Sequence, residues 1–228
     1  MPNAPSNARS TAILLSGGLD SAILLAELLG DNRRMQPIYI RSGLCWEPAE
    51  LHYVRRFLRA LAGPRLDPLR ILDLPVGDLY GDHWSVTGRG VPDAASEDAA
   101  VYLPGRNLLL VIKAALWCQM QNIGELALGV LGSNPFGDAR PEFFVHCEAA
   151  IQSATGSRTR LLRPFASRTK REVMLLGRGL PLELTFSCIA PVSRLHCGRC
   201  NKCAERQHAF ADAGIADPTP YASPCEVR

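Results

Sequence analysis

The sequence predicts an α/β protein built on a parallel sheet, and three observations support this. Apolar runs of strand length alternate with longer runs of helical periodicity up to residue 74. The segment Ser-Gly-Gly-Leu-Asp-Ser at 16–21 separates the first strand from the first helix. Hydrophobic residues make up 47% of the 228 residues, which is enough for a sizeable core. Strand–helix–strand alternation places parallel strands side by side through right-handed crossovers.

The first half of the chain supplies the clearest elements. They are a strand at 11–15, a helix at 22–29, a strand at 37–40, a helix at 47–61 and a strand at 70–74. In such a sheet, ligands bind beyond the carboxyl ends of the strands. The segment 16–21 falls at this edge.

The second half is less regular. Residues 75–101 are rich in Gly, Pro, Asp and Ser, so they predict a long loop with one helical turn, either a lid or a plain surface insertion. After it come a helix at 108–119, a strand at 125–131, a helix at 142–153 led by Pro141, a strand at 161–164 and a helix at 169–178.

Composition narrows the class of protein. A charged fraction of 21% and a net charge of +3 argue against a broad nucleic-acid surface, though not against a local basic pocket. No apolar run approaches membrane-spanning length. Residues 1–10 are expected to form a short disordered lead rather than a signal peptide. We expect a cytoplasmic protein with reduced thiols.

The segment 16–21 has the properties of a phosphate-binding loop. Two glycines allow the backbone to approach a ligand, and the following helix presents free N–H groups and the positive end of its dipole. The segment lacks the Lys-Ser/Thr pair of a Walker loop and resembles the pyrophosphate loop (PP-loop), SGGxDS, of ATP pyrophosphatases. A turn that merely caps a helix is the alternative. The predicted nucleotide-binding residues are Ser16, Gly17, Gly18, Leu19, Asp20 and Ser21.

Four of the eight cysteines form a second signal. Cys188, Cys197, Cys200 and Cys203 have the spacing of a closed thiolate tetrad, which suits structural zinc. An iron–sulfur cluster is the alternative, although the Cys-Pro pair typical of ferredoxins is absent. We expect Lys202, with Arg199 and Arg194, to offset the thiolate charge. The remaining four cysteines, among them Cys225, are expected to have ordinary structural roles.

Taken in order along the chain, the motifs resemble those of the 7-cyano-7-deazaguanine synthase (QueC) family. The motifs are SGGLDS (16–21), PGRN (104–107), GDARPEF (137–143), TKRE (169–172) and the cysteine tetrad, and they extend from Thr11 to about Ala211. Each piece alone is weak, but the ordered set is specific.

The resemblance implies a fold and a reaction. The fold is an adenine nucleotide α-hydrolase-like parallel sheet with helices on both faces. It corresponds here to a nucleotide-binding domain at 11–183 with a zinc-binding segment at 184–228 packed on it. Family members use ATP and ammonia to convert 7-carboxy-7-deazaguanine, through an adenylate and an amide, into the nitrile. ATP, Mg²⁺ and Zn²⁺ are thus the expected cofactors, and a homodimer without nucleic-acid or membrane partners is the expected assembly.

The resemblance also assigns roles to residues of this chain. Asp20, Lys170 and Arg106 are the candidate catalytic residues: Asp20 caps the helix or holds Mg²⁺, Lys170 binds phosphates, and Arg106 neutralises phosphate or the substrate carboxylate. The candidate substrate contacts are Arg106, Asn107, Asp138, Arg140 and Glu142.

The chain departs from the family pattern near the expected base-binding residues. The family has a Tyr-Gly-Gln segment and a histidine where this chain reads Ser42 to Glu47, and Asp, Ser and Tyr where it has Gly132, Asn134 and Phe136. Trp46 and Glu47, with Arg41, are candidate replacements. Three alternatives therefore remain: a divergent relative acting on another carboxylate or amide, a PP-loop tRNA-modifying enzyme, and a non-catalytic nucleotide-binding module stabilised by zinc.

Overall fold

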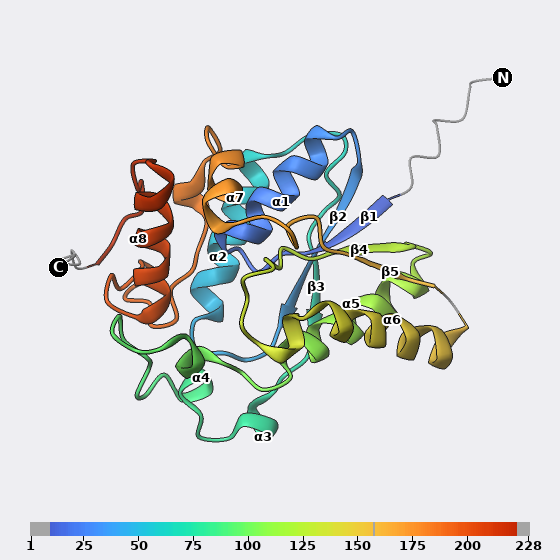
Figure 1. Ribbon diagram of the computed structural model, residues 1–228, viewed down its shortest axis with the longest axis horizontal. Helices are drawn as coiled ribbons and strands as arrows, with labels where there is room; N and C mark the ends of the chain where they lie inside the picture. Colours follow the sequence, from blue (N-terminus) through green and yellow to red (C-terminus); the bar gives the residue numbers. More distant parts are fainter. Residues whose placement is uncertain (1–9, 157, 223–228) are drawn as a thin grey trace.

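The computed structural model describes residues 10–156 and 158–222 and contains one five-stranded parallel sheet (Figure 1). The strand order is β3-β2-β1-β4-β5. The strands are β1 (Ser10–Leu14), β2 (Arg34–Arg41), β3 (Arg70–Asp73), β4 (Glu125–Ala127) and β5 (Arg160–Leu162). The chain first moves outward from β1 to β3 and then returns to the other side of β1. The connections therefore diverge between the carboxyl ends of β1 and β4, where doubly wound sheets bind ligands.

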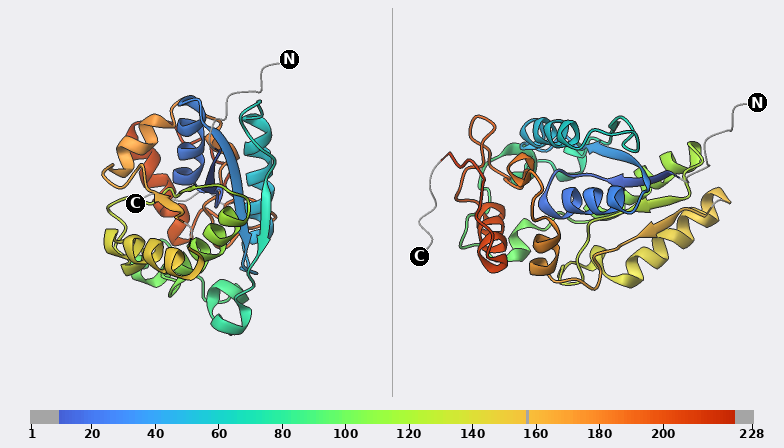
Figure 2. Two further views of the ribbon diagram at one scale, coloured as in Figure 1. Left: turned by 90° about the vertical axis from the view of Figure 1, so that its right-hand side faces the viewer. Right: turned by 90° about the horizontal axis from the view of Figure 1, so that it is seen from above.

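Helices cover both faces of the sheet (Figure 2). The helices α1 (Leu19–Gly30), α2 (Glu47–Ala60) and α7 (Lys170–Leu176) pack on one face, and α5 (Arg106–Met120) and α6 (Pro141–Thr155) pack on the other. Successive strand residues alternate between the two cores, as the two-residue period of a strand requires. Ile13 and Ala127 join the first core, whereas Ala12 and Leu126 join the second.

A third core joins the segment after β3 to the cysteine-bearing end of the chain. In it, Val76, Val101 and Leu103 are buried together with Phe186 and the cysteine tetrad. The other helices are α3 (Gly77–Tyr80), α4 (Trp84–Thr87), η1 (Asp98–Val101), η2 (Gly137–Ala139), η3 (Leu182–Leu184) and α8 (Asn201–Ala213).

The segment 75–101 contains more regular structure than the sequence predicted. Its backbone is tied to the C-terminal segment, because the N–H of Ala94 donates to the carbonyl of Arg199 and the N–H of Asn201 donates to that of Pro92, both at 3.0 Å. Apolar side chains hidden among the turn-forming residues hold it down. The segment is therefore a wall of the third core rather than a detached insertion.

The predicted fold class is confirmed, while several boundaries differ. Ser10 belongs to β1 rather than to the lead, and β4 ends at Ala127 instead of residue 131. Just beyond β4, Leu128 N–H still donates to the Leu162 carbonyl at 2.9 Å, and Gly129 then lies against the backbone at the start of α1. Residues 1–9 and Cys225 lie outside the described residues. Within the part of the chain that is described, no helix is long and apolar enough to span a membrane.

The boundary predicted between 183 and 184 remains a prediction. Phe210 and Ala213 of α8 lie in the same core as Ile23 of α1. The fully buried Arg206 donates to Thr185 Oγ1 at 2.8 Å and to Thr219 Oγ1 at 2.6 Å, and so ties α8 to the chain on either side of it. The C-terminal segment packs as an integral part of the fold.

Candidate functional site

A cavity of about 530 Å³ opens at the carboxyl ends of β1, β2 and β4. The loop 16–21, the residues after β4, the start of α5, Lys170 and the first turns of α8 contribute to its wall. The cavity therefore occupies the topological switch point of the sheet. It also brings together segments from both ends of the chain.

The loop 16–21 holds its shape through close backbone packing. Gly17 has φ +82°, and a Cβ there would lie 2.7 Å from Val54 Cγ2, so glycine is required on both counts. A Cβ on Gly129 would lie 2.9 Å from the backbone of Asp20 and Ser21. The hydroxyl of Ser21 donates to the Gly18 carbonyl at 3.2 Å.

The N-terminus of α1 faces this cavity without a capping side chain. Gly18 is the N-cap residue, and as a glycine it has no side chain that could cap the first turn. Ser16 and Ser21 line the cavity, with their hydroxyl oxygens 3.2 Å apart. Free N–H groups, the helix dipole and two hydroxyl groups together form a suitable binding site for an anion.

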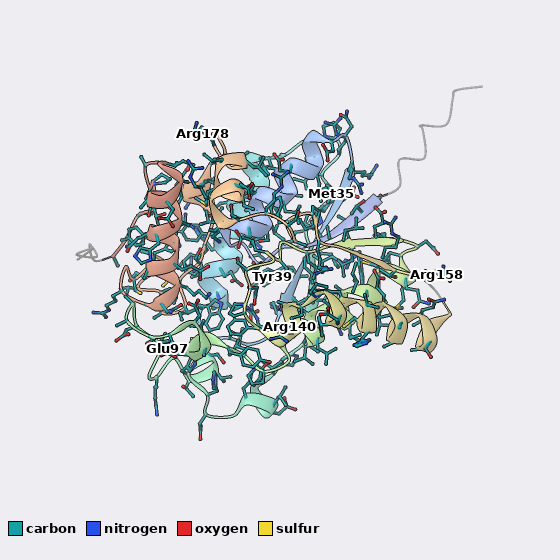
Figure 3. All side chains as sticks on the ribbon, in the orientation of Figure 1. Met35, Tyr39, Glu97, Arg140, Arg158 and Arg178 are labelled. Carbon is teal, nitrogen blue, oxygen red and sulfur yellow. The ribbon has the colours of Figure 1, made fainter. Side chains whose placement is uncertain are left out.

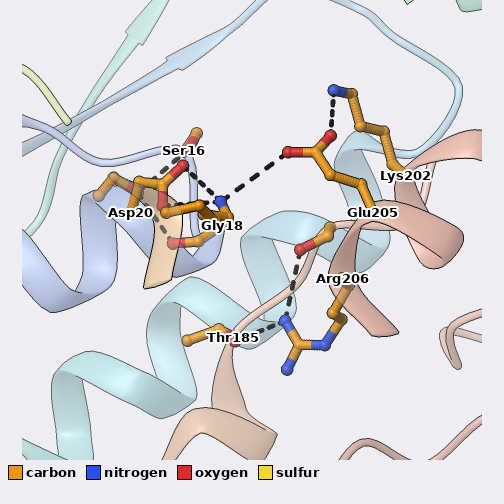
Figure 4. A network of polar contacts seen from close by, with 10 residues as sticks. Ser16, Gly18, Asp20, Thr185, Lys202, Glu205 and Arg206 are labelled. Carbon is orange, nitrogen blue, oxygen red and sulfur yellow. Dashed lines mark hydrogen bonds and ion pairs between the residues drawn. The ribbon is translucent and has the colours of Figure 1, made fainter. Parts of the chain in front are cut away.

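Asp20 and Lys170 meet across the cavity although 150 positions separate them. Lys170 Nζ donates to both carboxylate oxygens of Asp20 at 2.8 Å (Figure 4). A capping box between Thr169 and Glu172 starts α7 at Lys170 and fixes the base of this lysine. The structure therefore places two of the three candidate catalytic residues in direct contact.

Arg106, the third, lines the same cavity at the start of α5. Its Nε is buried and has no hydrogen-bond partner among the described residues. A buried guanidinium donor without a partner is costly, and an anionic ligand would satisfy it. Arg106 is thus available to a ligand.

Asn107 and Asp138 bind each other. The backbone N–H of Asn107 donates to Asp138 Oδ2 at 3.0 Å, and the Asn107 amide donates to the Asp138 carbonyl at 3.1 Å. Asn107 lines the cavity, but Asp138, Arg140 and Glu142 do not. Arg140 and Glu142 are exposed near the start of α6, where Figure 3 shows Arg140. The contacts proposed for these three residues would require a ligand or partner outside the cavity.

Trp46 and Glu47 have different surroundings. Trp46 lines the cavity and stacks on Trp84 with ring centroids 5.7 Å apart. Glu47 is buried, and its Oε2 accepts hydrogen bonds at 2.6–3.2 Å from the backbone N–H groups of residues 42–44. Its carboxylate therefore holds the loop after β2 in place, whereas Trp46 is buried in the third core with one edge at the cavity wall.

Sequence reasoning missed a polar pair in the cavity wall, formed by the buried Tyr39 and the half-buried Glu50. The Tyr39 hydroxyl donates to Glu50 Oε2 at 2.7 Å, and Figure 3 shows Tyr39 near the centre of the molecule. Burial raises the pKa of Glu50 to about 7, although the nearby Arg106 opposes the shift. One signal was available: Glu50 precedes the buried Tyr53 and Val54 by three and four positions, so it shares the inner face of α2.

Sequence reasoning also missed the contribution of α8. Lys202 and Glu205 line the cavity, and Lys202 Nζ donates to Glu205 Oε2 at 2.5 Å. Lys202 thus pairs with a carboxylate of its own helix and faces the cavity. The sequence offered no signal for this, because only the packing of α8 brings these residues to the loop 16–21.

The four cysteines of the tetrad converge. Their sulfur atoms lie within 4.8 Å of one another and all four residues are buried. Cys188 and Cys200, and likewise Cys197 and Cys203, have sulfur atoms 3.9 Å apart. Tetrahedral zinc with bonds of about 2.3 Å requires sulfur–sulfur edges of about 3.8 Å.

Backbone N–H groups complete the surroundings of these sulfurs. Cys188 Sγ accepts from Ala190 and Cys197 at 3.3 and 3.2 Å, and Cys197 Sγ accepts from Cys200 at 3.3 Å. Such hydrogen bonds stabilise thiolates, the form that binds a metal. The cluster therefore fits a structural zinc ion.

The sheet, the SGGxDS loop at its switch point and the opposing lysine define a PP-loop nucleotide-binding α/β protein. Consistent with this fold, the structure is similar to that of a 4-thiouridine synthetase in complex with RNA and bound ATP (TM-score 0.50, 15% identity, covering 92% of this chain and 51% of that one).

A family model described as queuosine biosynthesis protein QueC matches residues 10–214, and the chain belongs to this family. The 7-cyano-7-deazaguanine synthase of Methanothermobacter thermautotrophicus is 32% identical, covering 91% of this chain and 97% of its own. The 7-cyano-7-deazaguanine synthase of Leptospira interrogans is 30% identical, covering 93% of this chain and 90% of its own. The family resemblance drawn from the motifs is confirmed.

Cys200→Ser should lower the zinc content from about one ion per chain and destabilise the third core, because a structural zinc needs all four ligands. Metal analysis and thermal unfolding of the purified protein measure both effects. Cys45→Ser, which alters a thiol outside the tetrad, is the control and should keep its zinc. Full zinc in the Cys200 variant would contradict the assignment.

Glu50→Gln should change how stability depends on pH. Since folding raises the pKa of Glu50 from 4.5 to about 7, its stabilising contribution is complete below about pH 4.5 and is lost as the pH rises through 7. The variant, always neutral, should unfold at a temperature a few degrees higher than the wild type at pH 8 and close to it at pH 4.5. Thermal unfolding across this range tests the shift, with exposed Glu97→Gln as control. If the unfolding temperatures of Glu50→Gln and the wild type differed by the same amount at every pH, the raised pKa of Glu50 would be disproved.

Proposed function

We propose that this protein is an ATP-dependent ligase that converts 7-carboxy-7-deazaguanine and ammonia into 7-cyano-7-deazaguanine. The observation that carries the proposal is the meeting of the loop 16–21, Lys170, Asp20 and Arg106 at one cavity in a chain of the QueC family. Its relatives bear the name of this activity. Each of these residues has a role in the chemistry.

Activation of the acid is the first step. A carboxylate resists nucleophiles because of its charge, so one of its oxygens attacks the α-phosphorus of ATP and pyrophosphate leaves. The N–H groups of the loop and Lys170 would hold the departing pyrophosphate, and Asp20 would hold Mg²⁺ on it. Arg106, with its free Nε, would orient the acid.

Ammonia then displaces AMP from the adenylate and gives the amide. In the second half, the amide oxygen attacks the α-phosphorus of another ATP and pyrophosphate leaves; loss of AMP and of the two N–H protons then yields the nitrile. Both halves require a group that accepts protons from nitrogen. Glu50 suits this role, because it lines the cavity and its pKa of about 7 lies near the working pH.

The remaining wall suits a planar heteroaromatic acid. The cavity wall includes three aromatic residues: the half-buried Phe136 and the buried Trp46 and Phe186. Aromatic rings stack on flat ligands, and neighbouring polar groups fix the orientation of such ligands. The pair of Tyr39 and Glu50 supplies polar groups in the wall of a chain that lacks the family's glutamine and histidine.

The decisive experiment incubates the protein with Mg-ATP, ammonia and 7-carboxy-7-deazaguanine and follows the products by mass spectrometry. The nitrile, AMP and pyrophosphate should form. Asp20→Asn should lower turnover by about 100-fold or more, since it removes the charge that would hold Mg²⁺. Asp31→Asn, at the other end of α1, is the matched control and should retain turnover.

Two outcomes would change this assignment. Release of AMP only with another acid would reassign the substrate to a divergent member of the family. Full turnover by Asp20→Asn would remove Asp20 from the mechanism.

A homodimer is the assembly we propose, and the outer face of α5 supports it. Leu108, Leu116 and Met120 share one face of that helix and are exposed, with Met120 78% accessible. Val145 of α6 is also exposed. A second copy of this chain would bury these side chains.

Leu116→Glu should convert the dimer to a monomer, because a charge in an apolar interface is costly to bury. Light scattering during gel filtration measures the mass. Leu79→Glu, which alters an exposed leucine on α3, should leave the dimer intact. A monomeric wild type, or a dimer unaffected by Leu116→Glu, would contradict the interface.

A further inference from the structure

We propose that Lys202, carried by the cysteine-bearing segment, is a second cation for the pyrophosphate part of ATP, and that Glu205 holds it in place before the nucleotide binds. The inference rests on the proposed use of ATP. It adds to the PP-loop and Lys170 a phosphate-binding residue from α8. It also gives the cysteine cluster a part in nucleotide binding.

Four charges form a continuous chain along one side of the cavity. Asp20 contacts Lys170 at 2.8 Å, Lys170 lies 3.8 Å from Glu205 Oε1, and Glu205 Oε2 accepts from Lys202 (Figure 4). All four residues line the cavity. Signs alternate along the chain, so without a ligand each lysine has a carboxylate partner.

The four charged side chains can exchange partners at a low cost in free energy. The side chains of Lys170 and Lys202 are 28% and 32% accessible, and that of Glu205 is 46% accessible. Ion pairs with this exposure are weak, because water and salt screen them. A polyphosphate offers several charged oxygens to the same ammonium groups, so both lysines would transfer to it while Glu205 turns towards solvent.

The cysteine cluster fixes the position of Lys202. Its neighbours on either side are Asn201 and Cys203, and Cys200 precedes them. The Asn201 amide donates to the Ser96 carbonyl at 2.9 Å, and Cys200 and Cys203 are buried in the tetrad. The backbone of Lys202 is thereby held on both sides, which limits the freedom that its side chain loses when it binds.

A solvated lysine that pairs with Glu205 within one helix is the simpler explanation. Pairs three residues apart on a helix are common and weak. Two observations favour a binding role: both side chains line the cavity, and Glu205 reaches Lys170, which belongs to another helix. The experiment below separates the two explanations.

The test compares dissociation constants of Mg-ATP, pyrophosphate and AMP by calorimetry. Lys202→Gln should raise the dissociation constants of Mg-ATP and pyrophosphate about tenfold and leave that of AMP unchanged. A tenfold change is about the lower end of what a hydrogen bond between charged groups contributes. Lys202→Arg should restore most of the affinity. Arg178→Gln removes an exposed charge that does not line the cavity and should match the wild type.

Zinc content, measured on each variant, shows that the segment is intact. The role of Lys202 would be overturned if Lys202→Gln bound Mg-ATP with wild-type affinity. It would also be overturned if the variant bound AMP and Mg-ATP more weakly by the same factor. Failure of the wild type to bind Mg-ATP at all would instead overturn the proposed function. The two failures are therefore distinguishable.

Discussion

The close approach of three backbone segments around residues 16–21 is the constraint on which the site depends. Val54 of α2 leaves no room for a side chain on Gly17, and Gly129 lies directly against the start of α1. The N–H of Phe186 donates to the Gly17 carbonyl at 2.7 Å and closes the arrangement from the C-terminal side. Because the loop is held on all these sides, the first turn of α1 faces the cavity in a fixed orientation. Preorganised donors of this kind stabilise charge without a cost of reordering.

The same packing explains why the cysteine segment is more than an appendage. Phe186 and Cys188 are two residues apart. The segment that bonds to the loop 16–21 therefore also supplies the first sulfur of the tetrad. The segment 75–101 is bonded to the other side of the tetrad. Metal, loop and cavity wall therefore share one core. Loss of any one of these three would therefore disturb the packing of the other two.

The cavity also combines two kinds of residue. Its wall includes the loop 16–21, Asp20 and Lys170, which are polar or charged, and also the aromatic residues Trp46 and Phe136. Arg106 and Glu50 lie in the same wall. An enzyme that joins a nucleotide to a ring-bound carboxylate needs both kinds within reach of one another.

The sequence by itself determined the fold class, the phosphate loop and the cysteine tetrad. Each depends on residues that are close together in the sequence. The periodicity of strands and helices is a property of neighbouring residues, and the loop and the tetrad are short motifs with fixed spacing. The family followed from their order along the chain. The boundaries of α2 and α6 were close for local reasons as well, since α2 carries a strong periodic pattern and Pro141 marks the start of α6.

Only the tertiary structure decided which distant side chains meet. The contact of Asp20 with Lys170 spans 150 positions, and the place of Lys202 beside it depends on how α8 packs. It likewise turned Glu47 onto the backbone of residues 42–44 and Glu50 into the cavity wall, although both begin the same helix. Residue type and spacing restrict a side chain to one face of its element, whereas long-range packing decides what that face meets.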